Sequence, residues 1–341
     1  MTTFEHADGL DAFTGEWEAL AEESSNIFVT REWASIWRRH FAPEQPLRIV
    51  GCRDAAGRLF AVLPLYTESR KGIRTIRFLG HGAGDEVGPV CAGSDRAEAA
   101  AALRQILESD GTDLFLGDNL AGDFDWAGRL DGHVVRRSAS VVAEFGSKTW
   151  DEYLADRSAG LRRQLGRLER RLSEQDLRYR QTLRREQLDA DLDTLFKLHR
   201  ARWRGSPWFA SGEAFHREFA ATALERGWLR LWFLELAGTP AAVWLGYRFA
   251  GVESYYQAGR DPAWDKASVG AVLLAHTIRS ALEDGMSEYR FLVGAEGYKY
   301  RFATSHGGSV VRVARATSAA GRLALWALLV RGALRRLRRS N

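Results

Sequence analysis

The order of strands and helices predicted over residues 228–292 constrains the fold more than any other feature of this chain. Apolar strands are predicted at 228–236, 241–249 and 252–259, then a helix from about Ser268 to Asp284, then a strand at 288–292. Successive short strands followed by one long helical segment and a further strand are typical of an α/β unit with a crossover helix. We therefore expect an α/β fold with a mixed sheet in this part of the chain.

The first part of the chain has the same arrangement, although no sequence identity between the two parts is visible. Helices are predicted at 8–23, at 30–41 with Thr30 as the cap, and at about 95–108. Strands are predicted at 47–53, 58–66, 75–80, 113–117 and 139–145, with a glycine-rich loop at 80–89. Helices return at 161–172 and 188–203, each with an apolar stripe. The predicted organisation is one α/β half over 1–148, a second over 149–317, and a C-terminal helix over 318–341.

Composition and charge narrow the class of protein. Hydrophobic residues make up 45% and charged residues 27% of the 341 residues, which is typical of a soluble globular chain. The start of the sequence lacks a secretion signal, and no apolar run approaches the roughly 20 residues of a membrane span. Cys52 and Cys91 have no metal-ligand spacing, and neither His81 nor His306 has a partner at such spacing. We therefore predict a cytoplasmic protein with no metal.

The last part of the sequence is strongly basic. The net charge is +4, but residues 297–341 hold ten Lys and Arg and no acidic residue, so the rest of the chain is net −6. On a helical wheel one face gathers Leu323, Trp326, Val330, Leu334 and Leu337, and Arg331, Arg335, Arg338 and Arg339 lie largely off it. This pattern fits either an interfacial helix at the inner face of the cytoplasmic membrane or a helix docked on the body. No nucleic-acid motif accompanies the charge, so a DNA-binding role is not predicted.

The start of the helix at 268–284 is a candidate anion site. Ser268 can cap the helix, and Gly270 leaves the backbone N–H groups of the first turn open to a ligand. Lys266 lies just before this turn and adds positive charge. Free N–H groups at a helix start bind phosphate, so this turn can cradle a pyrophosphate. An ordinary capped helix is the alternative.

A second candidate site follows the strand at 288–292. Glu296, Tyr298, Lys299, Tyr300 and Arg301 come directly after it, and loops after strands often hold the sites of α/β folds. A glutamate can act as a base, a tyrosine as an acid, and a lysine as a charge partner for either. The alternative is a polar helix start with packed aromatic rings and solvated charges.

Other side chains are weaker candidates. His199 and Trp203 share a helix face, and Arg202 beside them can meet an anionic ligand. Asp85 lies in the glycine-rich loop, where it can present a carboxylate to an amine. The arginines of the 161–172 helix form either a solvated face or a binding patch. For each of these positions a purely structural role is the alternative.

The motifs together resemble the CelD-like, cellulose-biosynthesis-type acetyltransferases of the GNAT superfamily, which are related to the Fem aminoacyltransferases. The likeness is strongest over residues 150–305. It rests on the segments "LRRQLGRLERRL", "LHRARW", "GWLRLWFLEL", "SVGAVLLAHTI" and "FLVGAEGYKYRF". The chain departs from the family at Val269, where a proline is common. The resemblance implies a tandem GNAT-like fold.

The resemblance also implies where substrates lie. It places the pyrophosphate of acyl-CoA on the Ser268–Ala271 loop, and the thioester between the strand before this loop and the strand after its helix. The donor site that it implies comprises Gln257, Ala258, Gly259, Arg260, Lys266, Ser268, Val269, Gly270 and Ala271. The catalytic candidates are Glu296 as base, Asp85 as the second choice of base, Tyr298 as acid, and Lys299. The substrate-binding candidates are His199, Arg202, Trp203, Tyr256 and Tyr300.

The activity implied is transfer of an acyl group, acetyl or longer, from acyl-CoA to an amine of a cell-envelope polysaccharide or lipid precursor. Three alternatives stay open. The first is a Fem-type enzyme that uses aminoacyl-tRNA, with RNA bound by the 161–172 helix. The second is a long-chain N-acyltransferase of lipid synthesis, and the third is a non-catalytic envelope-assembly module.

Overall fold

The computed structural model describes residues 2–109, 111–203 and 208–340 of the chain. The chain divides into two units, and each is described by itself. Unit 1 comprises residues 1–139 and 308–341, and unit 2 comprises residues 140–307. The expected halves, 1–148 and 149–317, differ from this division at both boundaries. The chain returns to unit 1 after residue 307, because its last strand pairs with strands of that unit.

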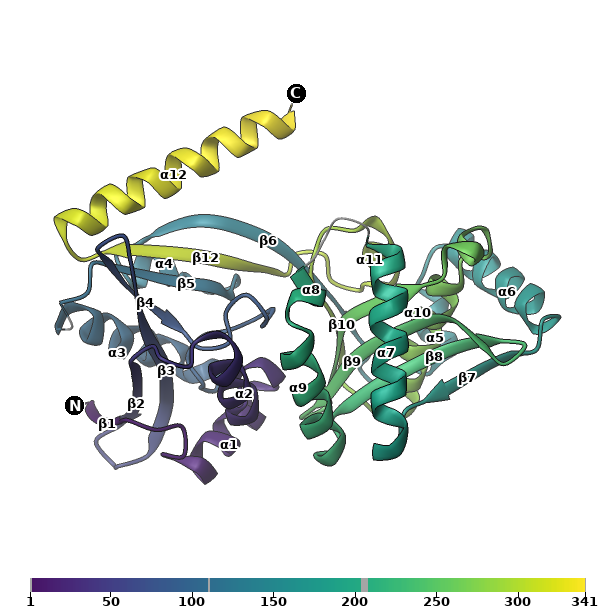
Figure 1. Cartoon of the computed structure of the whole chain (residues 1–341), viewed down its shortest axis with the longest axis horizontal. Coiled ribbons are helices and arrows are strands. Elements are labelled where there is room, and N and C mark those ends of the chain that lie inside the picture. The colour runs from purple at the N-terminus through teal and green to yellow at the C-terminus, as the bar shows by residue number, and fades with distance from the viewer. Residues whose placement is uncertain (1, 110, 204–207, 341) are drawn as a thin grey trace. The chain divides into compact units, whose positions relative to one another are not determined.

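Unit 1 is a mixed sheet with helices on it (Figure 1). Its strands are β1 (Thr3–Ala7), β2 (Leu47–Arg53), β3 (Leu59–Arg70), β4 (Ile73–Phe78), β5 (Leu114–Ala121), the first part of β6 (His133–Glu144) and β12 (Ser309–Ala316). Its helices are α1 (Thr14–Ser24), α2 (Arg31–Phe41), α3 (Arg96–Ser109), α4 (Trp126–Arg129) and α12 (Ala319–Ser340), with short 3-10 turns at Ile27–Val29 and Gly93–Asp95. The strand order is β1-β2-β3-β4-β5-β12-β6, and only β4 and β5 are parallel among these neighbours.

Unit 2 has the same plan. Its strands are the second part of β6, β7 (Leu177–Gln181), β8 (Leu229–Leu236), β9 (Thr239–Phe249), β10 (Val252–Arg260) and β11 (Glu288–Val293). Its helices are α5 (Trp150–Ala155), α6 (Ala159–Ser173), α7 (Arg185–Arg202), α8 (Trp208–Ser211), α9 (Glu213–Glu225), α10 (Val269–Glu283) and α11 (Gly297–Phe302), with the 3-10 helix η3 (Pro262–Ala267). Its strand order is β6-β11-β10-β9-β8-β7, with β10 and β11 parallel. In each unit the parallel pair flanks a crossover helix, α3 or α10, as the expected α/β arrangement requires.

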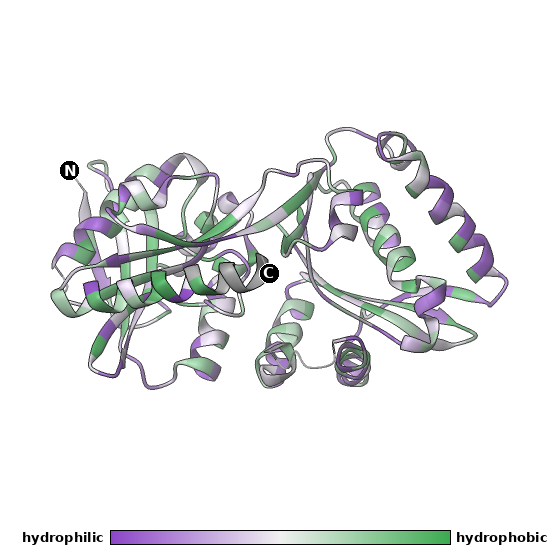
Figure 2. Cartoon of the chain, turned by 90° about the horizontal axis from the view of Figure 1, so that it is seen from above, coloured by the Kyte–Doolittle hydropathy of each residue, from purple (hydrophilic) through white to green (hydrophobic). Residues whose placement is uncertain are grey.

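The two faces of the unit 2 sheet carry different helices. Helices α7 and α9 lie on one face, and α10, α5 and α6 lie on the other (Figures 1 and 2). The predicted leucine stripe of α6 is confirmed: Leu161, Leu165, Leu168 and Leu172 are buried in the core with α10. The outer face of α6 is hydrophilic (Figure 2). Three consecutive leucine spacings of three or four residues are therefore enough to fix which face of this helix is buried.

Several local predictions need correction. Helix α1 begins at Thr14 rather than at residue 8, because residues 8–13 form bends and turns that end at Phe13 with a left-handed backbone (φ 60°). Strands β7 and β12 were not predicted. Both are short segments that contain two arginines each. Thr30 caps α2 as predicted, since its side chain accepts a hydrogen bond from the backbone N–H of Trp33.

Helix α12 lies on unit 1 by one face. Ala324, Leu325, Leu328 and Leu329 pack with Leu114 and Leu116 of β5 and with residues of β12. Gly321 lies so close to the carbonyl of Asp113 that a Cβ atom there would overlap it. The docked face is therefore not the face predicted from the helical wheel. Leu323, Trp326 and Leu334 of the predicted face are exposed, and Leu337 and the arginines after residue 334 lie outside the described side chains.

Candidate functional site

The gap between β10 and β11 is the structural basis of the candidate site. The two parallel strands pair only over Val252–Ser254 and Glu288–Arg290 and then separate. On its other edge, β10 has a register shift against β9 between Tyr255 and Gln257. This bulge changes the alternation of side chains, as bulges do next to active sites. Tyr255 and Ala258 both face a pocket on the α10 side, and Tyr256 packs on the α9 side.

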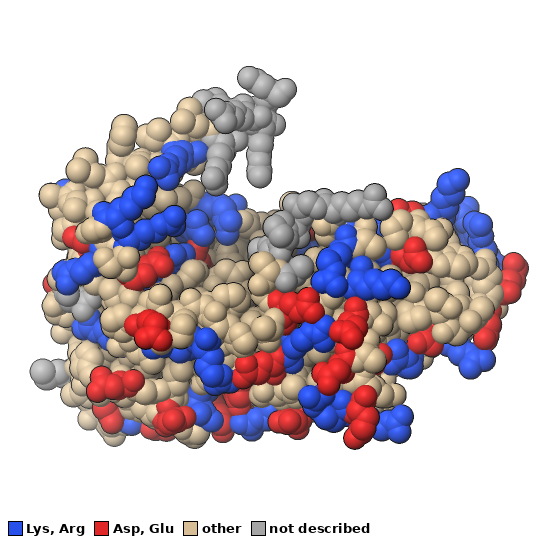
Figure 3. Space-filling view, viewed as in Figure 1, with Lys and Arg blue, Asp and Glu red and all other residues tan. Residues whose placement is uncertain are grey.

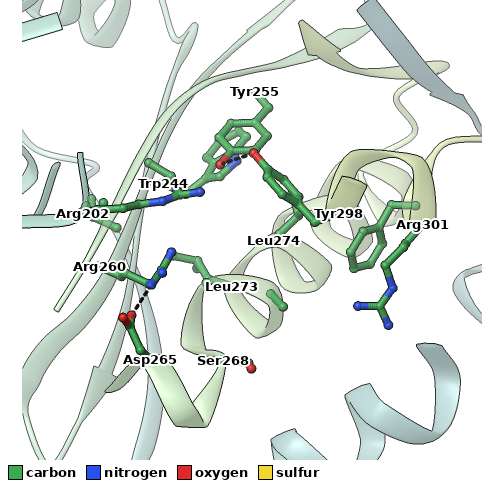
Figure 4. Close-up of a pocket in the computed structure, with 16 residues that line it drawn as sticks. Arg202, Trp244, Tyr255, Arg260, Asp265, Ser268, Leu273, Leu274, Tyr298 and Arg301 are labelled. Atoms are coloured by element: carbon green, nitrogen blue, oxygen red, sulfur yellow. Dashed lines mark hydrogen bonds and ion pairs between the residues drawn. The ribbon is translucent and has the colours of Figure 1, made fainter. Parts of the chain in front are cut away.

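The pocket lies between the end of β10, the start of α10 and the helix α11 (Figure 4). Its apolar wall is formed by Val243, Trp244, Leu273, Leu274 and Phe302. Its polar lining consists of Arg202, Tyr255, Arg260, Asp265, Ser268, Tyr298 and Arg301, with backbone at Gly259, Gly270 and Ala271. Arg260, Ser268 and Asp265 lie at one end, and Arg202, Tyr255 and Tyr298 lie at the other (Figure 4).

The start of α10 presents backbone N–H groups to the first of these ends. The N–H groups of Ala271 and Val272 donate to the Ser268 carbonyl. Val269 and Gly270 come before them in the first turn, where backbone N–H groups have no acceptor within the helix. Ser268 does not cap the helix with its side chain, which corrects that prediction. Its backbone is left-handed (φ 54°), and its hydroxyl lines the pocket instead. A turn of this kind followed by a helix start is suited to an anion.

Two arginines supply the positive charge at this end. Arg260 lines the pocket and pairs with Asp265 at 2.5 Å. Arg301 of α11 also lines it and donates to Gln164 of α6 at 2.6 Å. Lys266, the cation predicted here, is exposed on η3 and is not one of the pocket residues. A Cβ atom at Gly270 would have only the Arg260 Cδ atom within 4 Å, at 3.9 Å. Gly270 is therefore open on the side of the site.

Lys299 holds the end of β11 together. Its side chain is buried, and Nζ donates to the Val293 carbonyl at 2.9 Å and pairs with Glu296 Oε2 at 3.0 Å. Leu292, inside this turn, has a strained positive φ of 58° for a branched side chain. Glu296 is 40% exposed at its side chain and does not line the pocket. The predicted base, Glu296, thus forms an ion pair with Lys299, the lysine that was expected as a charge partner.

Two tyrosine hydroxyls meet at the other end of the pocket. Tyr298 of α11 donates to Tyr255 of β10 at 3.3 Å, and the side chain of Arg202 is directed toward both hydroxyl groups (Figure 4). Burial, and then the neighbouring phenol of Tyr255, raise the pKa of Tyr298. Tyr298 therefore stays protonated at neutral pH, as a general acid must be. Tyr300 points elsewhere, and its ring lies against His306.

The remaining predicted residues lie around β10 and α7. His199 is buried, and burial lowers its pKa to about 4. It is therefore neutral at physiological pH. Trp203 is 36% exposed beside the Arg202 guanidinium. A Cβ atom at Gly259 would meet backbone atoms of α7, so this glycine allows helix and strand to pack closely.

Asp85 lies in unit 1, on the glycine-rich loop after β4. The sequence pattern does not single out Tyr255 and Trp244 as lining residues, whereas Arg301 belongs to the second candidate site and lines the pocket. Tyr255 and Trp244 lie inside strands whose alternation predicts only burial, and the bulge that turns Tyr255 to the pocket has no local sequence signal. Within the described residues, no group of three or more His, Cys, Asp and Glu side chains is arranged to hold a metal. None of the described helices is both long enough and apolar enough to cross a bilayer.

A comparison with protein families matches a region that lies within unit 2. Residues 159–300 match the family model described as "Acetyltransferase (GNAT) domain". No curated protein matches the sequence.

Solved structures resemble the whole chain in fold at low sequence identity. FemX has a TM-score of 0.63 at 12% identity, with 90% of this chain and 96% of that chain covered. A tandem GNAT protein from the clavulanic acid biosynthesis pathway has a TM-score of 0.53 at 12% identity, covering 93% and 99%. L-PGS, a lysylphosphatidylglycerol synthetase, from Bacillus licheniformis has a TM-score of 0.56 at 11% identity, covering 94% and 95%. The pocket described above lies within the matched domain. Residues 159–300 thus match a GNAT acetyltransferase domain, and the chain has the fold of tandem GNAT proteins.

Proposed function

We propose that the protein transfers an acyl group from acyl-CoA to an amine of a cell-envelope polysaccharide or lipid precursor. Its resemblance to the CelD-like acetyltransferases implies this activity. The observation that carries the proposal is the pocket beside the separated strands β10 and β11. It combines the open helix start at Val269 and Gly270 with the guanidinium groups of Arg260 and Arg301. This set of donors suits the pyrophosphate of CoA.

The proposed reaction needs a base, an acid and a site for the developing oxyanion. The amine nitrogen attacks the thioester carbonyl, the C–N bond forms and the C–S bond breaks. Glu296 is the proposed base that takes the amine proton. Tyr298 is the proposed donor of a proton to the departing CoA thiolate, since its raised pKa keeps the phenol protonated. Backbone N–H groups near the bulge, at Gln257 or Ala258, would stabilise the oxyanion.

The first experiment measures the binding of acetyl-CoA and of palmitoyl-CoA by calorimetry. We expect one of them to bind, and Gly270→Glu to abolish the binding, because a carboxylate would then occupy the anion site. Gly270→Ala is the matched control, since a methyl group there meets only the Arg260 Cδ atom at 3.9 Å. If neither CoA ester binds to the wild-type protein, the acyl-CoA proposal is wrong.

A Fem-type activity is the second candidate, and one feature of α6 favours it. Arg163, Arg167 and Arg170 are exposed along the outer face of this helix, and blue side chains mark the region in Figure 3. Gln164 of the same face accepts a hydrogen bond from Arg301, which joins the basic face to the pocket. A polyanionic donor such as aminoacyl-tRNA could therefore lie along α6. Retention of RNA by the wild-type protein, lost when the three arginines become glutamine, would support this candidate.

We also propose that α12 rests on the inner face of the cytoplasmic membrane. While its other face is docked on unit 1, Leu323 and Trp326 are 73% and 67% exposed, and Arg322 and Arg331 are exposed beside them. Apolar side chains flanked by arginines suit an interface with anionic lipid. Both cysteines are free and buried, which fits a cytoplasmic location.

Vesicle flotation tests this location without removing the docked face. Leu323→Ser with Trp326→Ser should abolish binding to vesicles that contain phosphatidylglycerol. Leu183→Ser is the matched control, because Leu183 is also 68% exposed but lies in unit 2. Unchanged flotation of the double variant would contradict the proposal.

A further inference from the structure

Arg202 is the last residue of α7, and it is a cation at the end of the pocket away from the helix start. Its side chain runs toward the hydroxyl groups of Tyr255 and Tyr298 (Figure 4). Trp244 forms the wall beside it. The guanidinium thus lies among two phenols and two indoles, those of Trp244 and Trp203.

No carboxylate neutralises this guanidinium in the part of the chain that the structure describes. Other half-buried arginines of unit 2 have anionic or carbonyl partners. Arg248 pairs with Glu253 and Asp284, and Arg180 with Asp191 and Glu235. Arg157 and Arg230 donate to backbone carbonyl groups instead. Even Arg260, at the opposite end of the same pocket, pairs with Asp265. Removing a cation from water without a counter-ion is unfavourable, and neutral phenols offset only part of that cost. Arg202 is therefore placed to receive an anion from outside the chain.

The anion that fits Arg202 is not the pyrophosphate of the donor. Arg260 and Ser268 mark the phosphate end of the pocket, and the apolar side chains of Leu273 and Leu274 lie between that end and Tyr298 (Figure 4). Tyr298 is the proposed acid for the departing thiolate, so Arg202 lies at the reacting end. An anion at this position belongs to the acyl group or to the acceptor.

We propose that Arg202 binds a carboxylate of the substrate, either at the far end of a dicarboxylic acyl group or next to the amine of an amino-acid-like acceptor. A planar guanidinium fork matches a carboxylate with two hydrogen bonds, and the Tyr255 and Tyr298 hydroxyls complete the shell. This inference rests on the proposed N-acyltransferase function and adds the substrate class. Arg202 is a specificity residue, because a substrate without the carboxylate leaves the guanidinium unpaired.

The test compares substrate pairs that differ in the carboxylate. The donor pair is succinyl-CoA and butyryl-CoA, and the acceptor pair is glycine and methylamine with acetyl-CoA as donor. Calorimetry measures donor affinity, and CoA release measures turnover. We expect one pair to favour the carboxylate by at least about tenfold. Arg202→Met should remove that preference and leave the affinity for CoA itself within about twofold, since CoA carries no acyl carboxylate.

Arg200→Met is the matched control. Arg200 lies on the same helix, but it is 55% exposed and pairs with Glu213, so the preference should survive this change. The pair that shows the preference identifies whether donor or acceptor carries the carboxylate. The inference is overturned if wild-type protein shows no preference in either pair, or if Arg202→Met keeps it.

A separate readout distinguishes failure of this inference from failure of the proposed function. If CoA and its esters do not bind, the acyl-CoA proposal fails. Thermal stabilisation by free succinate and by free glycine then tests carboxylate binding at Arg202 independently of CoA. One of the two ligands should raise the Tm of the wild-type protein and of Arg200→Met but not of Arg202→Met, and an equal response of all three proteins would refute it.

Discussion

Replacing Gly259 tests whether the close packing of β10 on α7 is needed for stability and for the position of the site residues. A Cβ atom at this position would lie 2.4 Å from the backbone nitrogen of His199 and 2.5 Å from the carbonyl carbon of Leu198, whereas ordinary contacts begin at 3.4 Å. In Gly259→Ala the helix must therefore recede by about 1 Å (3.4 − 2.4). Both obstacles are backbone atoms, so no side-chain rotation relieves them. We expect a loss of about 3 kcal/mol in the free energy of unfolding, at the upper end for overpacking.

The same displacement should weaken function, because α7 carries His199 and Arg202. A shift of about 1 Å in positioning residues can cost up to about 100-fold in activity, so we expect at least a tenfold loss of donor turnover. Urea denaturation followed by circular dichroism measures the stability. Gly166→Ala in α6 is the control: its Cβ would meet nothing within 4 Å, and a helical glycine replaced by alanine should gain about 0.5–1 kcal/mol. A Gly259→Ala protein as stable as wild type would refute the close-packing argument.

Three further predictions concern charge and pH. Asp118→Asn should lower the free energy of unfolding by about 3 kcal/mol, because this carboxylate, 3% exposed, pairs with Arg77 and Arg312. Asp156→Asn, whose pair with Lys148 is exposed, should lower it far less in the same urea assay. Burial lowers the pKa of His276 to about 4 from 6.5, so between these pH values the unfolded chain binds more protons than the folded protein. The free energy of unfolding should therefore rise with pH in this range, by up to about 1.4 kcal/mol per pH unit. His276→Phe, which keeps the ring stacked on Tyr179, should flatten this rise in unfolding curves measured at a series of pH values. Lys299→Met should lower the free energy of unfolding by about 1–3 kcal/mol and weaken CoA binding, because the Val293 carbonyl and Glu296 lose their partner. Wild-type CoA affinity of this variant in calorimetry would show that Lys299 is not needed to hold the loop after β11.

Part of the candidate site could be predicted because its signals are local. The start of α10 follows from the periodic apolar segment that begins at Val269, and the polar loop after β11 follows directly from the sequence order. The role of Ser268 could not be predicted, since its left-handed backbone depends on how η3 leads into the helix. Glu296 was a reasonable base from its residue type alone. Its ion pair with Lys299 depends on how α11 folds back onto the end of β11.

The sequence by itself determined the elements with a strong apolar pattern: the leucine stripe of α6, the apolar runs of β8 to β10, and the crossover helix α10. It also determined the basic character of α12, although not the face by which that helix docks. Only the tertiary structure decided that Arg202, Tyr255 and Tyr298 meet in one pocket, and that the chain returns to unit 1 after residue 307. The physical reason is that periodicity depends on neighbours within one or two turns. The meeting of side chains from α7, β10 and α11 depends on a β-bulge and on the early end of a parallel pairing, which long-range hydrogen bonds and packing set.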